Sequence, residues 1–331
     1  MIRIVCFVVL AVCTLCCHRF IDQYETIGAD LLTNDWQIIG NGKQSVRVLD
    51  DGFCLVSLSA EKSVSIKQEL KTFKPGSKLK LSSFIRFDDV VQGAKSWNRA
   101  RLLLLQNDGI KDRWDLCHSV ASLKGSGDWG CYEAVFPIAA FAKKVTVVAQ
   151  LSRCSGSFEL KDIQLIPVKQ TWAYTWAARC LLGAWGCFAV IFLWNCLSAV
   201  RFQNGLKIIA VGLFILILIG TCMPIEIKKD VSQTIVTYVN QAAHSMEAYL
   251  PRDYSKIGHF LLFSLLGITM AGLTGHFSFG AVFLNILMVA SGTELAQFFI
   301  EGRSPLIKDF LLDACGGSIG VSLFYFRRSW K

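Results

Sequence analysis

Two patterns of apolar and polar positions divide the chain near residue 170. In residues 20–170, apolar and polar side chains alternate over short runs, as in Cys54, Val56 and Leu58, with Gly, Ser, Asp and Lys in the turns between runs. Because successive side chains of a strand point to opposite faces, this alternation predicts strands with one buried face. The succession of short strands predicts an all-β jelly-roll sandwich over residues 20–170.

Residues 171–331 instead contain long apolar segments. A helix needs roughly 17–25 residues to cross a bilayer, and turn-forming residues at 272–280 divide the longest apolar segment into two. The sequence therefore predicts an all-α bundle of about five transmembrane helices in this part of the chain. They are expected at residues 180–200, 208–225, 257–273, 279–300 and 308–326.

The first 19 residues form a separate segment. Arg3 precedes the apolar run Ile4–Cys17. This run has about 14 residues, which is too short for a typical span and suits the core of a signal peptide. The small-residue cleavage pattern of a signal peptide does not follow the run. We therefore expect residues 1–19 to be either a cleaved signal peptide or an uncleaved signal anchor, and both would export residues 20–170.

Composition supports a soluble part joined to a membrane part. The chain has 331 residues with a mean hydropathy of +0.44, and 18% of them are charged, whereas soluble proteins have roughly 25%. Residues 20–170 hold about 37 charged side chains and residues 171–331 about 20. This asymmetry excludes a single soluble domain and a disordered chain. The net charge of +9 is spread along the chain without a basic stripe, so we expect no nucleic-acid partner.

Basic residues near the apolar segments predict the orientation. Arg201 and Lys207 flank the first short connection, and Arg327 and Arg328 follow the last span. Short basic loops favour the cytoplasmic side, so residues 20–170 and 226–256 are expected outside the cytoplasmic membrane and the C-terminus inside. Apolar residues at helical spacing over 231–250 predict an amphipathic helix on the outer membrane surface or against the bundle.

Four cysteines lie in the exported part, where disulfides are able to form. Three pairings are open for four cysteines, and four free thiols are an equal alternative. The spacings match no zinc site. Four tryptophans in the same part are candidates for stacking on a sugar, although core packing is the commoner role. The cysteines are Cys54, Cys117, Cys131 and Cys154, and the tryptophans are Trp36, Trp97, Trp114 and Trp129.

Polar residues gather in the last three predicted helices, near their outer ends. At 1.5 Å per residue, Glu294 and Asp313 lie about 9 Å below the outer ends of two antiparallel neighbours. Because unpaired charges at such depth are costly, we expect the side chains to converge, with Arg303 pairing Asp309 or Glu294. The cluster comprises Lys256, His259, Glu294, Gln297, Arg303, Asp309 and Asp313.

Two interpretations of this polar cluster remain open. It is either an ion-pair clamp that joins three helices or an outer-leaflet site for a polar headgroup or a proton. Gly316, Gly317 and Gly320 follow at a spacing that permits close helix packing. No nucleophile constellation, phosphate-binding loop or metal-ligand spacing occurs in the sequence, so no cofactor or metal is expected.

The end of the exported part is similar to a known group of modules, over residues 127–129, 143–151 and 155–165. This stretch of roughly 40 residues resembles the last strands of galactose-binding-like jelly-roll modules, a group that includes many carbohydrate-binding modules. The resemblance implies a glycan-binding type of fold. It assigns no ligand contact to a particular side chain.

The spacing of the polar cluster carries a second resemblance, over about residues 200–326. Three of its motifs resemble those of the VanZ-like membrane proteins. They are Lys256 with His259, Glu294 with Gln297, and Arg303 followed by Asp309. Ser255 stands where the family pattern has Asp, and Asp313 stands where it has Asn. The resemblance implies a bacterial cytoplasmic-membrane protein and an association with glycopeptide resistance.

We therefore expect a bacterial inner-membrane protein that binds or senses cell-envelope glycans or lipid-linked precursors, with membrane lipids as its other partners. The alternative is a membrane enzyme acting on a lipid or glycolipid headgroup, with Glu294 and His259 as its acid–base pair. A proton-coupled transporter is a third hypothesis. It is disfavoured because the acidic residues gather near the outer side instead of lining a path to the cytoplasm.

Overall fold

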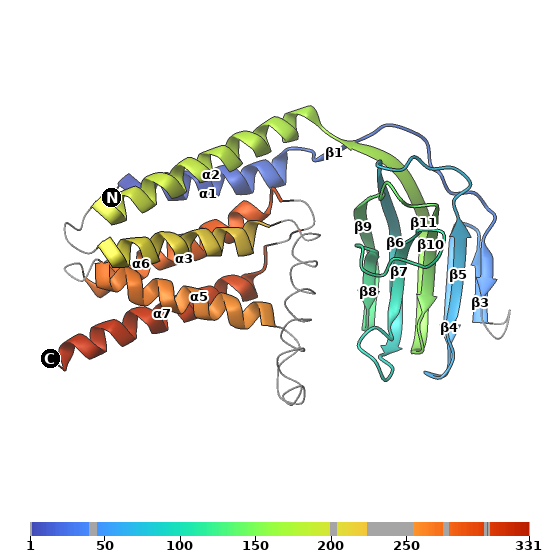
Figure 1. The fold of residues 1–331 in the computed structure, drawn as a ribbon. Coiled ribbons are helices and arrows are strands. Elements are labelled where there is room, and N and C mark those ends of the chain that lie inside the picture. The colour runs from blue at the N-terminus through green and yellow to red at the C-terminus, as the bar shows by residue number, and fades with distance from the viewer. Residues whose placement is uncertain are drawn as a thin grey trace. The chain divides into compact units, whose positions relative to one another are not determined.

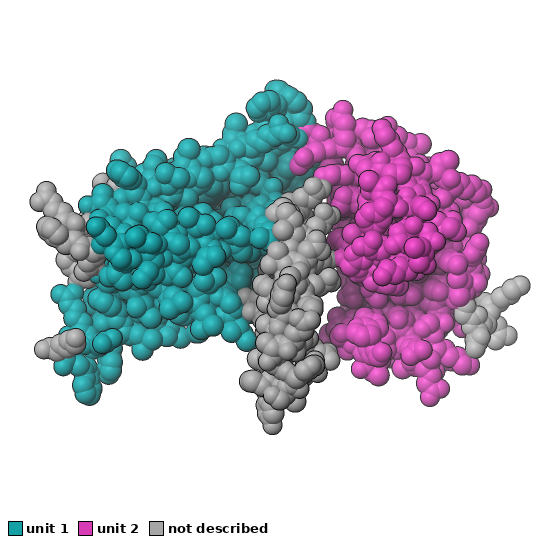
Figure 2. All heavy atoms as spheres, in the orientation of Figure 1, with its two compact units in different colours: residues 1–23, 172–331 teal, residues 24–171 magenta. Residues whose placement is uncertain are grey.

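The computed structural model describes residues 2–39, 45–198, 204–223, 254–273, 278–300, 303 and 305–330. The chain forms two compact units, which Figure 2 colours separately. One unit is residues 24–171. The other combines residues 1–23 with residues 172–331. The expected helix over residues 231–250 lies outside the described residues.

Residues 24–171 form a β-sandwich of two antiparallel sheets (Figure 1). One sheet has the strand order β3-β4-β11-β6-β9 with β1 paired to β11, and the other has the order β2-β5-β10-β7-β8. The strands are β1 (Tyr24–Thr26), β2 (Gln37–Ile39), β3 (Val46–Leu49), β4 (Gly52–Ser57), β5 (Val64–Glu69), β6 (Lys78–Val91), β7 (Ala100–Asn107), β8 (Ser119–Leu123), β9 (Gly125–Pro137), β10 (Lys144–Leu151) and β11 (Ser155–Gln170).

The period-two pattern of the sequence explains the core between the two sheets. In β10, Val145, Val147, Ala149 and Leu151 are fully buried, and the residues between them are partly exposed. Leu160 of β11 and residues from the facing sheet join the same apolar core. The β-sandwich expected from the alternation is therefore confirmed.

The other unit is helical. Within the described residues, six of its helices are each long and apolar enough to cross a membrane. Five of these fall in residues 172–331, and the sixth lies near the N-terminus. The helices are α1 (Ile2–Phe20), α2 (Trp172–Ser198), α3 (Asn204–Cys222), α5 (Tyr254–Leu273), α6 (Phe279–Gln297) and α7 (Ile307–Ser329).

Helix α1 is longer than the apolar run Ile4–Cys17. The helix extends over 19 residues because it continues through His18 and Arg19, whose long or polar side chains can reach a membrane interface. The Trp185 Nε1 of α2 donates a hydrogen bond to Thr14 Oγ1 at 3.0 Å, and Phe7 packs edge-on against the Trp185 ring. Residues 1–23 therefore belong to the same compact unit as the other helices.

The helical unit has two ends, which Figure 1 shows. Helix α1 ends and α2 begins at one of them, so we call it the β-linked end. Helices α3 and α6 also end there, and α5 and α7 begin there. The opposite end holds the last residues of α7, including Arg327 and Arg328.

Candidate functional site

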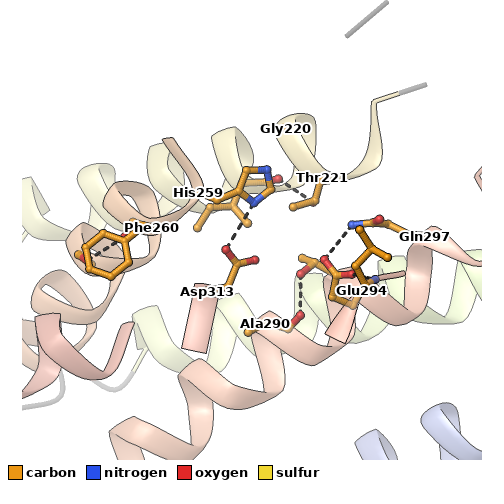
Figure 3. A network of polar contacts seen from close by, with 12 residues as sticks. Gly220, Thr221, His259, Phe260, Ala290, Glu294, Gln297 and Asp313 are labelled. Atoms are coloured by element: carbon orange, nitrogen blue, oxygen red, sulfur yellow. Dashed lines mark hydrogen bonds and ion pairs between the residues drawn. The ribbon is translucent and has the colours of Figure 1, made fainter. Parts of the chain in front are cut away.

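The polar residues singled out in the sequence lie at the β-linked end of α5, α6 and α7. Figure 3 shows His259, Glu294, Gln297 and Asp313 from close by. Glu294, Gln297 and Asp313 are all buried, with exposed fractions of 6%, 5% and 0%. They belong to two sets of contacts with different character.

Glu294 belongs to the first set, and its carboxylate is fully engaged. Gln297, one turn further along α6, donates from Nε2 to Glu294 Oε1 at 3.0 Å. The backbone N–H of Leu306 donates to Glu294 Oε2 at 2.9 Å. Leu306 is the N-cap of α7 and has no side-chain capping bond, so the carboxylate ties the end of α6 to the positive end of the α7 dipole. We call Glu294, Gln297 and the Leu306 amide the clamp.

The second set is a pair formed by His259 of α5 and Asp313 of α7. The His259 Nδ1 lies 3.4 Å from Asp313 Oδ1, and the histidine side chain is 20% exposed. Neither Asp313 oxygen accepts a hydrogen bond from the residues that the structure describes. A buried carboxylate without donors is unusual because its desolvation is left uncompensated. We call these two side chains the His–Asp pair.

Arg303 corrects the expectation of an ion pair with Asp309 or Glu294. Its Nε donates to the Met223 carbonyl at 3.1 Å, and its Nη2 donates to the Gly220 carbonyl at 3.2 Å. Both carbonyls belong to the last turn of α3, where backbone oxygens lack partners within the helix. A cation is also favoured at the negative end of the helix dipole. Arg303 therefore holds α3 and does not neutralise the acids.

Lys256 and Asp309 lie at the edge of the cluster. The Lys256 side chain is exposed on α5, and Asp309 is half-buried in the first turn of α7. The structure thus brings His259, Glu294, Gln297 and Asp313 together and leaves Lys256 outside the buried group.

Close contact between α5 and α7 positions the His–Asp pair. A Cβ on Gly316 would lie 2.5 Å from the Phe260 carbonyl oxygen, and one on Gly320 would lie 2.0 Å from the Ser264 carbonyl oxygen. A Cβ on Gly317 would lie 2.2 Å from Ile286 Cγ2 of α6. Asp313 is three residues before Gly316 and shares its helix face. The glycines therefore let α7 approach α5 at the level where Asp313 faces His259.

Several contacts of the candidate site could not be predicted from the sequence because they involve backbone groups. The Leu306 amide and the carbonyls of Gly220 and Met223 have no side-chain signature in a sequence. Gly267 of α5 was also missed, although a Cβ there would lie 2.4 Å from the Gly317 carbonyl oxygen. Gly267 could have been found as a small residue that faces Gly316, Gly317 and Gly320 of α7.

The four candidate disulfide cysteines are free thiols in the structure. Cys54 and Cys154 are buried in the sandwich, whereas Cys117 and Cys131 are exposed. Burial raises the pKa of the Cys154 thiol to about 11. The structure does not join any of these four residues, so it supports the free-thiol alternative. Within the described residues, no group of three metal-ligating side chains occurs either.

The four tryptophans of the sandwich differ in their surroundings. Trp36 packs against the core and lies 5.3 Å from the Phe53 ring. Trp97 and Trp114 are 54% and 51% exposed. The Trp129 ring lies beneath two cations, with Arg86 at 5.3 Å and Lys161 at 5.0 Å. Trp97 and Trp114 are therefore accessible for stacking, Trp129 is occupied by the two cations, and Trp36 is a core residue.

Residues 208–328 match the VanZ/LLP1 family model. The matched region runs from within α3 to the end of α7 and contains the clamp and the His–Asp pair. No curated protein matches the sequence of the chain.

Several solved structures are similar to part of the chain. Tailspike protein 4 of bacteriophage CBA120 shares 12% identity with a TM-score of 0.30, over 42% of this chain and 21% of the tailspike chain. TmCBM61 in complex with β-1,4-galactotriose has 12% identity and a TM-score of 0.30, over 42% of this chain and 99% of that one. A family 11 carbohydrate-binding module from Clostridium thermocellum in complex with a mixed-linked tetrasaccharide has 15% identity and a TM-score of 0.30, over 44% and 96%.

Proposed function

Because the helical unit carries the VanZ/LLP1 match, we propose that the protein is a bacterial inner-membrane protein that binds a lipid-linked envelope glycan. In this proposal the His–Asp pair holds the polar headgroup, and the exported sandwich binds the glycan. The observation that carries the proposal is the Asp313 carboxylate, which is fully buried and accepts no hydrogen bond from the described residues.

The state of Asp313 favours a ligand because the neighbouring carboxylate is satisfied. Both Glu294 oxygens accept hydrogen bonds at 2.9–3.0 Å, so Glu294 has a sufficient structural role. Among the described residues, only a long contact to His259 compensates the desolvation of Asp313. Hydroxyl and amino groups of a sugar or headgroup are donors that would satisfy its oxygens. His259 is the partly exposed member of the pair, with 20% of its side chain accessible.

Accessible aromatic rings support glycan binding by the sandwich. Trp97 and Trp114 are about half-exposed, and aromatic rings that present a flat apolar face beside polar groups are typical of ligand sites. In the proposed orientation the sandwich lies on the outer side of the membrane, where envelope glycans occur. A role in glycopeptide resistance or envelope maintenance would follow from such binding.

A headgroup enzyme is the second candidate, and one observation favours it. His259 Nδ1 faces the Asp313 carboxylate, which would orient the imidazole and leave Nε2 for a proton of the substrate. In this candidate the acid–base pair is His259 and Asp313 in place of Glu294 and His259, because the Glu294 oxygens already accept hydrogen bonds from Gln297 and Leu306. Turnover of a bound lipid by the purified protein would favour this candidate over binding alone.

Native mass spectrometry of the full-length protein in mild detergent tests the proposed function. We expect a glycolipid or lipid-linked glycan to co-purify with the wild type and to be depleted in Asp313→Asn. Ser318→Ala is the matched control, because Ser318 lies on the same helix and its hydroxyl donates only to the Ala314 carbonyl. Equal lipid occupancy in the wild type and in Asp313→Asn would refute the assignment of the site.

A further inference from the structure

The outer face of the five-stranded sheet carries a polar row around Arg101. Leu102 and Leu104 of β7 point into the sandwich core, so Arg101 points away from it. Its direct neighbours across the sheet are Gln150 of β10 and Ser122 of β8. These three polar side chains therefore lie side by side on a face that does not belong to the core.

The connection between β7 and β8 folds over this face. The backbone N–H of Leu104 donates to the His118 carbonyl at 2.9 Å, and Leu103 is fully buried although it faces away from the core. His118 Nδ1 lies 2.7 Å from the Leu116 carbonyl oxygen. Because a carbonyl only accepts, Nδ1 carries the hydrogen, and Nε2 accepts from Arg101 Nη2 at 3.3 Å.

The charge of Arg101 has no counter-charge among the described residues. Two other arginines of the sandwich are paired with acids, Arg86 with Glu159 and Arg113 with Asp115, each at 2.7 Å. Among the described residues, the Arg101 guanidinium makes one hydrogen bond, from Nη2 to His118, and its Nε is buried without an acceptor. Burial accordingly lowers the pKa of the Arg101 guanidinium. A desolvated cation without an acid costs stability, which an anionic ligand would offset.

We propose that Arg101 binds the carboxylate of an acidic sugar on the outer face of the five-stranded sheet. This inference rests on the proposed glycan binding and specifies the ligand as a uronic-acid type of glycan. The planar guanidinium matches a carboxylate with two parallel hydrogen bonds. Trp114, which packs against His118 with ring centres 5.3 Å apart, presents a half-exposed ring for stacking on the sugar. Gln150 and Ser122 are placed to bind its hydroxyl groups.

The test measures binding of two matched oligosaccharides to the full-length protein in detergent by titration calorimetry. One probe is a short oligogalacturonate. The other is the same oligosaccharide after its carboxyl groups have been reduced to primary alcohols. We expect the acidic probe to bind at least about tenfold more tightly, which is the usual scale for one charge-assisted pair of hydrogen bonds, and its affinity to fall as salt is added.

Two variants and a control assign the binding to the site. Arg101→Gln should remove the preference for the acidic probe, and Trp114→Ala should weaken binding of both probes. Arg47→Gln is the charge-matched control, because Arg47 is exposed on the six-stranded sheet. Trp114 is 51% exposed, so its replacement leaves the fold intact and keeps the test valid if Arg101→Gln is unstable.

The outcomes separate this inference from the proposed function. Equal affinity for both probes would leave glycan binding in place and overturn the acidic ligand. Equal losses in Arg101→Gln and Arg47→Gln would show a non-specific charge effect and would also overturn it. Failure of the acidic probe to bind at all would overturn the inference, whereas the headgroup site is decided independently by the co-purifying lipid.

Discussion

Two buried carboxylates at the same end of the helical unit have different surroundings. Glu294 accepts from the Gln297 amide and the Leu306 backbone, whereas neither Asp313 oxygen accepts a hydrogen bond from the described residues. The sequence placed both acids near helix ends but left a clamp and a ligand site as open interpretations. The structure distinguishes the two carboxylates by their hydrogen bonds, and bonds to backbone groups leave no trace in a sequence.

Cysteine reactivity in the sandwich follows from burial. We expect iodoacetamide to label Cys117 and Cys131 of the native full-length protein and to leave Cys54 and Cys154 unlabelled, because the first two are exposed and the others are buried. Mass-spectrometric mapping of labelled peptides checks this. A disulfide would instead give a Cys117 or Cys131 that is labelled only after reduction.

The same burial makes stability depend on pH. Burial raises the pKa of Cys154 to about 11, so its thiol stays neutral in the folded chain at a pH where the unfolded chain ionises. This contributes stability below about pH 8.5 that is lost as the pH rises toward 11. We therefore expect Cys154 to stay unlabelled at pH 9.5 until denaturant is added. Labelling of Cys154 in the native protein at that pH would contradict the burial.

At the level of elements, the α5–α7 contact depends on glycine. The sequence predicted close packing from the spacing of Gly316 and Gly320, but not which helix would lie opposite. The structure shows α5 there, with its Phe260 and Ser264 carbonyls against the two glycines. The partner could not be predicted because three helices offered apolar faces of similar composition.

Replacing Gly320 tests this contact. Gly320→Ala should destabilise the helical unit by about 1–3 kcal/mol, the usual cost of overpacking, because its Cβ would lie 2.0 Å from a backbone oxygen. Gly212→Ala in α3 is the control, because nothing lies within 4 Å of its added Cβ. The control should keep or raise the melting temperature in detergent. Equal effects of the two changes would refute the close contact.

Helix α1 is the element that sequence reasoning described least well. The apolar run suggested a signal-peptide core, since periodicity does not show that a helix continues through His18 and Arg19. In the structure the Trp185 indole donates to Thr14 Oγ1, and both side chains are buried. We infer that α1 is retained as a transmembrane helix.

A pair of Thr14 variants tests whether α1 is retained. Thr14→Val should lower the melting temperature, because a buried indole N–H without an acceptor costs about 1–3 kcal/mol. Thr14→Ser keeps the hydroxyl and should behave as the wild type. If α1 is cleaved, neither change will have an effect, and the intact mass of the purified protein will lack these residues.

At the scale of the whole molecule, the division into a sandwich and an apolar helical unit was predictable. Alternation of apolar and polar residues marked the strands, and long uncharged segments marked the helices, because both patterns follow directly from element geometry. The contact of α1 with α2 and the link from Arg303 to α3 were not predictable. Each joins segments far apart in the chain: Thr14 and Phe7 meet Trp185 in the first, and the Arg303 guanidinium meets two carbonyl groups in the second.

The orientation in the membrane is a prediction for the whole chain. We expect phosphatase fusions after residues 170 and 256 to be active and those after residues 204 and 331 to be inactive, because basic residues favour the cytoplasmic side. With α1 retained, Arg3 also lies on the cytoplasmic side. Phosphatase activity from the fusion after residue 204 would reverse the assignment.

The separation of the clamp from the His–Asp pair is the central claim, and the melting temperatures of two charge-removing variants in detergent test it most directly. The Glu294 carboxylate accepts one hydrogen bond on each oxygen, whereas the amide in Glu294→Gln has a single oxygen to accept them. We therefore expect the variant to lose about 1–3 kcal/mol of stability. Asp313→Asn removes a buried charge whose oxygens accept no hydrogen bond from the described residues and whose ion-pair contact with His259 is long, at 3.4 Å, so its melting temperature should equal or exceed that of the wild type. A drop in Asp313→Asn as large as that in Glu294→Gln would show that both acids are structural and would contradict the account.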